Sequence, residues 1–568
     1  MRGHGSLPPK MRSNANSTES ASRSMDLSKS DEEPAKPGRS PVVPDMLSRA
    51  LRHHRAGRLR DAARIYRQIL GVDAQQADSL HLLGMIAHQA GGDDLAVTMI
   101  RKAVAINGQE AVFHANLGTV LQAQNKPEEA AACYRQALVL KPDLAEVHVN
   151  LGNLFQSQGR LDEAAACYAR ALAFSPGLAE AHHSLGNVLQ GQEKPDEAAE
   201  CYERALALTP NYARAHYNLG CVLRALGKVD EALARFKIAV ALQPDYSQAG
   251  FSVSLAQLLK GDFAAGWHNY EKRWQSEDHH TPRRNYSQPF WAGERLLSGR
   301  LLIWGEQGVG DEIMFAGLIP DVIRTNNCCV LDCDVRLQPL FARSFPEVDV
   351  ISSRADGYDF EHDPERKIAA QLPCASLPGL FRSSSTAFAA TKWPYLIADP
   401  AEREKFRARY RGGLRNSDRN RLIGLAWHTN NRKTGSARSI DLSWLSPLLA
   451  RQDICWVSLQ YGDHAALESQ AAAANARIHI DRSVDQLANV DLLAAQVAAM
   501  DMVITIDNST AHLAGALGVH TWVLLPFAPD WRWLLEREDS PWYPTLRLFR
   551  QPKRGDWQSV VQRVWSLL

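Results

Sequence analysis

The segment WGEQGVGDE begins at Trp304 and places two acids, Glu306 and Asp311, in a glycine-rich loop. An apolar helical pattern follows, so Asp311 falls at a helix start. Gly308 and Gly310 would let the backbone approach a ligand. Aspartate is also a favoured N-cap, and the alternative is that Asp311 only caps the helix. The loop is not a Walker A motif, because no Lys-Ser or Lys-Thr pair follows it. It is not a dinucleotide fingerprint either, because its glycines have the wrong spacing.

A second polar cluster, DNSTAH, ends an apolar strand pattern at Asp507. Asn508, Ser509 and Thr510 then open a helix that carries His512. Backbone N–H groups at such a helix start favour a phosphate, and the hydroxyls of Ser509 and Thr510 could add hydrogen bonds. Asp507 could accept a hydrogen bond from a sugar hydroxyl, and His512 points to the same region or packs against the sheet. The alternative is an ordinary helix cap.

Cations for such a phosphate are available in the segment LAWHTNNRKTGSARS, which follows another apolar strand pattern. It holds His428, Arg432, Lys433, Arg438 and Ser439. Arg438 is the first candidate for pairing with a diphosphate, because the guanidinium fork matches phosphate oxygens, and Lys433 is the second. The alternative is a solvated surface loop.

The segment PFAPDWRWL follows the last apolar strand pattern. Trp531 or Trp533 could stack on a nucleotide base there, and the alternative is that both belong to the core.

These segments lie in a half of the chain where short apolar strands alternate with helical patterns, which indicates parallel sheets covered by helices. We predict one such α/β part over 296–400 and another over 421–568, facing each other across a cleft. The charged stretch 401–420 is predicted to connect them, within an irregular region around 385–420. Ligands of open parallel sheets bind beyond the carboxyl ends of strands, where all four segments fall.

The first half repeats itself every 34 residues. The aligned columns are Leu117, Leu151, Leu185 and Leu219; Gly118, Gly152, Gly186 and Gly220; Tyr134, Tyr168, Tyr202 and Phe236; and Pro142, Pro176, Pro210 and Pro244. The pattern resembles the tetratricopeptide repeat, in which the glycine lets helix A pack on helix B, the aromatic fills the groove and the proline stops helix B. We expect six or seven repeats over 44–275, forming an α solenoid with a concave groove. A polar tail, 1–43, precedes them and a linker, 276–295, follows.

One further column precedes each repeat leucine: Asn116, Asn150, Ser184 and Asn218. An amide offers both a donor and an acceptor, so a row of amides could hold an extended acceptor peptide by its backbone. The string HxNLG is similar to the repeats of eukaryotic protein O-linked N-acetylglucosamine transferases, where an asparagine ladder lines the groove. The alternative is that these residues cap or bridge within each repeat.

GVGD in the first α/β part and DNSTAHLAGALG in the second resemble heptosyltransferase-type glycosyltransferases. The resemblance covers roughly 296–550 and implies a GT-B fold, two Rossmann-like domains around a cleft. It implies that Asp311 is the general base and that the DNSTAH loop holds the diphosphate and sugar of a nucleotide-sugar donor. Those families usually read Asp-Thr-Gly where Asp507, Asn508 and Ser509 stand, so the donor need not be ADP-heptose.

Composition narrows the function class. Lys plus Arg number 64 and Asp plus Glu number 63, which argues against a dedicated nucleic-acid binder. Neither a long apolar span nor a secretory signal is recognisable, and the scattered cysteines favour a reduced, cytoplasmic protein without disulfides. CCVLDC has no partner at a zinc-like spacing, so we predict no metal site and buried thiols. His279 and His280 are expected to be solvated.

The fusion predicts a cytoplasmic, metal-independent glycosyltransferase that uses a nucleotide-sugar as co-substrate and modifies Ser or Thr of a protein held by the repeats. The whole architecture is similar to bacterial relatives of protein O-linked glycosyltransferases, including the flagellin-modifying type. Two alternatives stay open: a non-catalytic interaction scaffold with a degenerate sugar domain, and a glycosyltransferase acting on a glycan. The nucleotide, the sugar, the acceptor, the oligomeric state and inversion or retention also stay open, although the resembled families invert.

Overall fold

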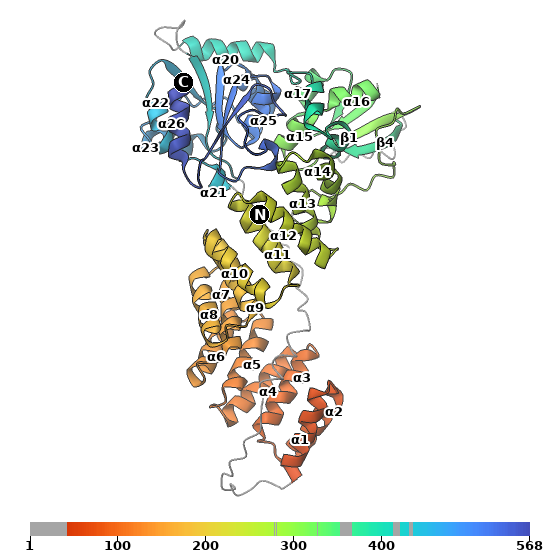
Figure 1. Cartoon of the computed structure of the whole chain (residues 1–568), viewed down its shortest axis with the longest axis vertical. Coiled ribbons are helices and arrows are strands. Elements are labelled where there is room, and N and C mark those ends of the chain that lie inside the picture. Colours follow the sequence, from red (N-terminus) through yellow and green to blue (C-terminus); the bar gives the residue numbers. More distant parts are fainter. Residues whose placement is uncertain are drawn as a thin grey trace. The chain divides into compact units, whose positions relative to one another are not determined.

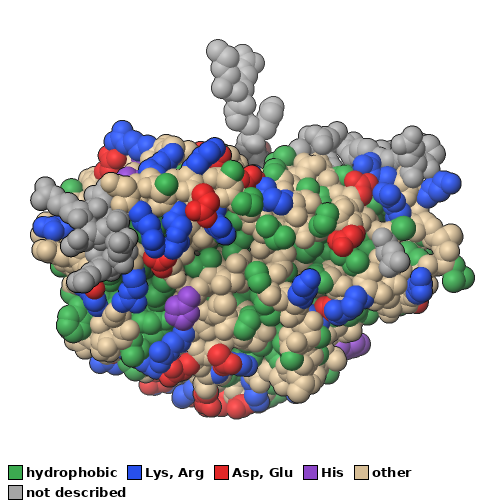
Figure 2. All heavy atoms as spheres, turned by 90° about the horizontal axis from the view of Figure 1, so that it is seen from above, with side chains coloured by type: hydrophobic (Ala, Val, Ile, Leu, Met, Phe, Trp, Pro, Cys, Tyr) green, Lys and Arg blue, Asp and Glu red, His purple; other side chains and the backbone are tan. Residues whose placement is uncertain are grey.

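The computed structural model describes residues 42–568 except 278, 280, 327, 353–365, 413–420 and 431–434. The chain divides into two compact units, one up to Glu193 and one from Lys194 to Leu568, and each is described by itself (Figure 1). No helix in the described ranges is both long and apolar enough to cross a bilayer. Figure 2 shows basic and acidic side chains intermixed over the face in view.

Antiparallel helix pairs build the predicted repeats in both units. The first unit contains α1 (Val42–Arg55), α2 (Leu59–Val72), α3 (Ala77–Gln89), α4 (Asp93–Ile106), α5 (Ala111–Ala123), α6 (Pro127–Leu140), α7 (Ala145–Ser157), α8 (Leu161–Phe174) and α9 (Ala179–Gly191). The second unit continues with α10 (Pro195–Leu208), α11 (Ala213–Ala225), α12 (Val229–Leu242), α13 (Ser247–Leu259), α14 (Phe263–Tyr270) and the 3-10 turn η1 (Glu271–Gln275).

A left-handed residue in each turn within a helix pair sets the 34-residue period. Positive φ recurs at Gly57, Gly91, Asn125, Gly159, Glu193, Gly227 and Gly261. Glycine and asparagine adopt this conformation readily, which explains their use at the turn. The column extends the repeats from α1 to α14, at the upper end of the expected number.

The glycine and aromatic columns do what their spacing predicts. Tyr134 and Tyr168 are fully buried. A Cβ added to Gly118 would lie 2.7 Å from Cε1 of Tyr134, and one added to Gly152 would lie 2.8 Å from Cε1 of Tyr168. The ring therefore occupies the space that any larger residue in the glycine column would need.

Replacing Gly152 with alanine should therefore destabilise the repeats by about 1–3 kcal/mol, the usual range for overpacking a core. The Tyr168 ring cannot withdraw easily, because its hydroxyl donates to Asn153 at 2.6 Å and to Gln156 at 2.9 Å. Urea unfolding followed by circular dichroism measures the change. Gly177→Ala is the matched control, since a Cβ there meets nothing within 4 Å. Equal stabilities of the two variants would contradict the packing argument.

A histidine column, which was not predicted, connects helix A of these repeats to the preceding turn. Nε2 of His148 lies 3.0 Å from the carbonyl oxygen of Pro142, and Nε2 of His182 lies 3.0 Å from that of Pro176. His216 repeats this contact with Pro210 at 2.9 Å. The imidazole thus satisfies a carbonyl just beyond the end of helix B.

The remainder of the second unit is α/β. The first part contains β1 (Arg300–Trp304), α15 (Val309–Ala316), α16 (Ile319–Thr325), β2 (Cys329–Asp332), α17 (Gln338–Ser344), β3 (Asp349–Ile351), β4 (Ile368–Pro373), η3 (Cys374–Ser376), α19 (Leu377–Phe381) and η4 (Ser385–Ala390). The second contains α20 (Pro400–Gly412), β5 (Arg421–Ala426), α21 (Gly435–Arg438), η5 (Leu442–Leu445), α22 (Ser446–Leu449), β6 (Ile454–Ser458), α23 (His464–Ala473), α24 (Val490–Ala498), β7 (Met502–Ile506), α25 (Ser509–Ala516), β8 (Thr521–Leu525), η6 (Trp531–Trp533), β9 (Leu546–Arg550) and α26 (Trp557–Leu567).

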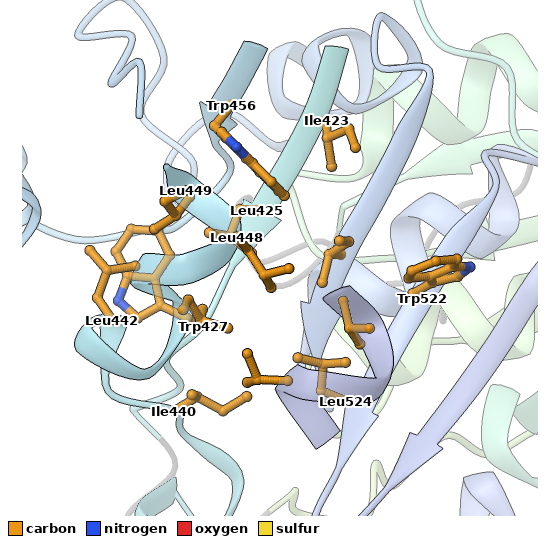
Figure 3. Packing of buried hydrophobic residues seen from close by; sticks show 14 of the residues in the cluster. Ile423, Leu425, Trp427, Ile440, Leu442, Leu448, Leu449, Trp456, Trp522 and Leu524 are labelled. Carbon is orange, nitrogen blue, oxygen red and sulfur yellow. The ribbon is translucent and has the colours of Figure 1, made fainter. Parts of the chain in front are cut away.

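Both sheets are parallel throughout their described strands. Their orders are β3-β2-β1-β4 and β6-β5-β7-β8-β9. On one face of the second sheet, Ile423, Leu425 and Trp522 pack with Leu448 of α22 and Trp456 of β6 (Figure 3). The prediction of parallel sheets with helices in this half of the chain is confirmed.

Two local predictions were wrong. The stretch around 385–420 is not wholly irregular, because 400–412 forms α20, whose Phe406 and Tyr410 lie four residues apart and are buried on one face. The predicted continuous helix after the glycine-rich loop is two helices, α15 and α16, with Pro320 in the first turn of the second. Strands β4 and β9 and helix α26 were not predicted at all.

The last helix pair belongs structurally to the α/β core. Trp267 of α14 packs edge-on against Trp531 at 5.3 Å between ring centroids and against Trp542 at 6.2 Å. Its indole N–H donates to the carbonyl of Arg382 at 3.0 Å. Tyr270 adds a further edge contact to Trp531 at 6.0 Å.

Candidate functional site

The strand orders define where a ligand could bind. In the second sheet, β5 lies between β6 and β7, so the chain leaves β5 to one side and returns on the other, which creates a crevice beyond the carboxyl ends of β5 and β7. Arg438 follows β5 and Asp507 follows β7 directly. In the first sheet the equivalent position lies between β1 and β4, and Asp311 follows β1.

A chain of opposite charges joins these positions. Nη1 of Arg438 lies 3.1 Å from Oδ2 of Asp507, and its Nη2 lies 3.3 Å from Oδ2 of Asp530. Arg532 contacts Asp530 at 2.6 Å and also pairs with Oδ1 of Asp311. Three carboxylates and two guanidinium groups from both α/β parts thus form one cluster.

Asp311 both caps its helix and joins the cluster. It is the third residue of α15, and Oδ2 accepts a hydrogen bond from the N–H of Gly308 at 3.3 Å. Its other oxygen faces Arg532, and 19% of the side chain is exposed. The cap therefore engages one oxygen, and the ion pair with Arg532 engages the other.

The DNSTAH loop is more closed than predicted. Oδ1 of Asn508 accepts from the backbone N–H groups of Thr510 at 3.0 Å and Ala511 at 3.3 Å. The prediction that these N–H groups are exposed was therefore wrong, because the asparagine side chain satisfies them. Ser509 is half-buried, whereas Asn508 and Thr510 are buried.

His512 packs inside the protein, the second of the two placements left open. Its ring stacks on Trp533 with 5.3 Å between centroids, and Nδ1 lies 2.8 Å from the hydroxyl of Tyr543. Burial lowers the pKa of His512 to about 3, so the imidazole is neutral near pH 7 and supplies no cation for a phosphate.

This histidine should make the protein less stable in mild acid. The unfolded chain binds a proton at His512 with a pKa of roughly 6.5, while the folded chain does not until about 3. The stabilisation is complete above the unfolded pKa and falls by about 1.5 kcal/mol between pH 6.5 and 5. Urea unfolding at these pH values should show a shallower pH dependence for His512→Gln. His428→Gln, which removes an exposed imidazole, is the matched control. An unchanged slope in His512→Gln would refute the assignment.

The two carboxylates beside Arg438 differ in character. Burial raises the pKa of Asp507, and the nearby Arg438 only partly offsets this. Burial acts on Asp530 in the same direction, but Arg532 and Arg438 outweigh it and lower the pKa to about 2. Asp530 is therefore the firmly ionised member of the pair, whereas Asp507 takes up a proton more readily.

Gly310 of the glycine-rich loop lies close to protein atoms, where the sequence predicted the approach of a ligand. A Cβ on Gly310 would meet Cδ2 of His512 at 3.3 Å and Cα of Ser509 at 3.4 Å. The start of α15 therefore packs directly on the start of α25, and at this point the two α/β parts touch instead of facing across an open cleft. Gly308 is the N-cap of α15, in extended conformation.

Glu306, the other acid of the loop, is structural. It is fully buried and accepts two hydrogen bonds from Arg273, at 2.9 Å from Nε and 2.8 Å from Nη2. Nε2 of His279 lies 3.4 Å from Glu306, and the imidazole is 4% exposed. The expectation of a solvated His279 was wrong, because this carboxylate and the Trp274 ring enclose it. His280 lies outside the described residues.

The remaining predicted site residues have different outcomes. Trp531 and Trp533 are buried, so the base-stacking hypothesis is wrong and both belong to the core. His428 is exposed, and the hydroxyl of Ser439 accepts from the N–H of Thr429 at 3.1 Å. Lys433 and Arg432 lie outside the described residues. Among the described residues, no group of His, Cys, Asp and Glu is arranged to hold a metal.

The residues of the asparagine column have different surroundings. Asn116 lies 2.7 Å from Nε2 of His81, an internal bridge between repeats. Ser184 is buried and hydrogen-bonds Tyr168. Asn150 is half-buried and, within the part of the chain that the structure describes, has no hydrogen-bond partner. Asn218 in the second unit is also half-buried.

Sequence reasoning missed Arg532 and Asp530, which complete the cluster. Their signal is the string Asp-Trp-Arg in a loop after an apolar strand, since alternating charges at a strand end in an α/β sheet indicate a site.

Comparisons with known proteins agree with the repeat assignment. Tetratricopeptide repeat models match residues 143–211, 183–247 and 217–266, and a TPR repeat model matches 118–159. Among solved structures, YrrB, described as a TPR protein with an unusual peptide-binding site, is 26% identical, covering 32% of this chain and 91% of that one with a TM-score of 0.28. PilF of Pseudomonas aeruginosa is 23% identical, covering 35% and 89% with a TM-score of 0.32.

Protein FlbA of Caulobacter vibrioides is 31% identical over 333 residues, which are 56% of this chain and 54% of FlbA. The chain thus spans about half the length of this curated relative. More than half of 568 residues cannot fit into the 275 that end with η1, so the likeness reaches past the repeats. The N-terminal region of this chain contains tetratricopeptide repeats. An α/β region with two parallel sheets follows them, and the similarity to FlbA extends beyond the repeats.

Proposed function

We propose that the chain is a glycosyltransferase that moves a sugar from a nucleotide-sugar donor to a Ser or Thr hydroxyl of a protein held by its repeats. One observation carries the proposal: side chains from the carboxyl ends of two parallel sheets meet in one charged cluster, at the positions where such sheets bind ligands. The repeats of the same chain suit an extended polypeptide.

Each member of the cluster has a role in such a transfer. Asp311 takes the proton from the acceptor hydroxyl as its oxygen bonds to the anomeric carbon of the sugar. The bond from that carbon to the donor diphosphate breaks, and the diphosphate leaves with the electron pair. Arg438, 20% exposed, is the cation placed to stabilise the charge that develops on the diphosphate. Among the groove candidates, Asn150 has an amide available for the acceptor backbone.

A thermal-shift screen against UDP-, GDP-, ADP- and CMP-sugars tests donor binding. A donor at about one hundred times its dissociation constant should add about 2.7 kcal/mol of stability. Arg438→Gln should lose the shift, while Arg537→Gln, which breaks an exposed pair with Asp539, should keep it. Incorporation of labelled sugar into protein then tests the acceptor. Label found only in saccharide products would favour the glycan-directed version.

A non-catalytic scaffold is the second candidate, and one observation favours it. The guanidinium groups of Arg438 and Arg532 already face carboxylates, and the starts of α15 and α25 are in direct contact. A folded protein that binds none of the nucleotide-sugars would support this candidate against the enzyme.

A further inference from the structure

Arg532 connects the two α/β parts through an ion pair with Asp311. Its guanidinium lies over the Trp531 ring at 4.4 Å, and that ring is fixed by Trp267 and Tyr270. The stem and plane of Arg532 are thus held by aromatic packing. Its charged end meets Asp530 on its own loop and Asp311 on the other part.

The contact occupies the proposed base. One oxygen of Asp311 faces Arg532 and the other accepts from the Gly308 N–H, so both oxygens are engaged. With a guanidinium on one oxygen and a backbone N–H on the other, neither oxygen is open to an acceptor hydroxyl. In this conformation Asp311 is poorly placed to take a proton from a hydroxyl.

Arg438 differs from Arg532 in which α/β part supplies its carboxylate partners. Both of its carboxylates, Asp507 and Asp530, come from the same α/β part and are 4% and 18% exposed. Arg532 is 13% exposed, and its partner Asp311 is 19% exposed and comes from the opposite part. The pair of Arg532 and Asp311 is therefore the one that a ligand entering between the parts could separate.

We propose that Arg532 exchanges Asp311 for the diphosphate of the donor, so that the base is released only when donor is bound. The inference rests on the proposed function and adds a positioning residue to it. A guanidinium pairs with phosphate oxygens through two parallel hydrogen bonds, and a diphosphate carries more charge than one carboxylate. Donor and Asp311 compete for one cation, so the base is free only in a complex that already holds donor, and donor must bind before the acceptor hydroxyl can be deprotonated.

The exchange predicts an unusual sign in a double-mutant cycle. Asp311→Asn removes the competing charge and should tighten binding of a nucleoside diphosphate by about fivefold or more. Arg532→Gln should weaken binding by about tenfold, and Arg532→Lys should recover part of the loss. In the Arg532→Gln background, Asp311→Asn should have no effect, because no cation is left to compete for. Calorimetric titration with UDP, GDP and ADP gives the affinities.

Asp539→Asn and Arg537→Gln are matched controls, since they break an exposed ion pair in the same region and should leave affinity unchanged. Asp311→Ser is a second neutral variant in case Asp311→Asn does not fold. If Asp311 only supported the fold, its loss would weaken binding, the opposite sign. Unchanged or weaker binding in the neutral variants overturns the exchange and leaves the glycosyltransferase standing. If none of the three nucleotides binds the wild type, the exchange is overturned, and the thermal-shift screen with all four classes of nucleotide-sugar decides the glycosyltransferase.

Discussion

Replacing Glu306 with glutamine should destabilise the second unit by roughly 3–5 kcal/mol, the range for removing one partner of a buried ion pair. The side chains of Glu306 and Arg273 are both 0% exposed, and the variant would leave the buried guanidinium with only the half-exposed Glu271 as counter-ion, 2.9 Å from its Nη1. The N–H of Ala375 also donates to Glu306 at 3.2 Å, so the carboxylate holds η1, β1 and the end of β4 together. Urea unfolding followed by tryptophan fluorescence measures the loss.

The double variant Arg273→Met with Glu306→Leu should be much less destabilised than the sum of its single variants, because it buries no charge. Arg537→Gln, at an exposed pair, should change stability by less than about 1 kcal/mol. Burial raises the pKa of Glu306, but Arg273 outweighs it and the net pKa is lowered. Its stabilisation is therefore present above an unfolded pKa of about 4.3 and is lost as pH falls below that. Additive single variants would show that the pair is not coupled.

Asp311→Asn should lower the rate of sugar transfer to protein by about 10²–10⁴-fold, the usual contribution of a general base. Its stability should change only modestly, since asparagine keeps an oxygen for the Gly308 N–H and Arg532 keeps Asp530 as a counter-ion. Initial rates with saturating donor, measured as labelled protein, separate this loss from any change in affinity.

Asp539→Asn, at an exposed site, serves as the rate control for this prediction. A variant Asp311→Asn with wild-type turnover would remove Asp311 from the mechanism, whatever its effect on donor binding.

The repeats were predictable because each of their columns has one local cause. Gly152 and Tyr168 are 16 positions apart in every copy, and the same ring fills the same gap each time. The α/β strands were predictable where apolar runs are long, as in β7, and were missed where small or polar residues interrupt them, as in β4. Helix α20 was missed because charged side chains surround the two buried aromatic residues on its apolar face.

The candidate site was predictable only in part. Asp507 was found because it directly follows a strand, and Asp311 because it starts the helix after one, and the sequence marks both positions. Arg532 was not found, because its partner Asp311 lies 221 positions away and no periodic pattern links them. The role of Glu306 was hidden for the same reason, since its counter-ion Arg273 lies in what reads as the end of a repeat.

Because the last two helix pairs pack against the α/β region, they limit where this chain can be joined to a foreign repeat array in a chimera. A Cβ on Gly227, in the turn between α11 and α12, would meet Phe527 of the loop after β8 at 3.1 Å, and Trp267 of α14 lies among the tryptophans of that region. A chimera with a foreign array should therefore be joined upstream of α11, so that α11 to η1 travel with the sheets. A joint at the linker, where the repeat pattern ends in the sequence, would strip aromatic packing and the Arg273 counter-charge from the α/β half. The modular boundary of the polypeptide thus lies two helix pairs earlier than its repeat boundary.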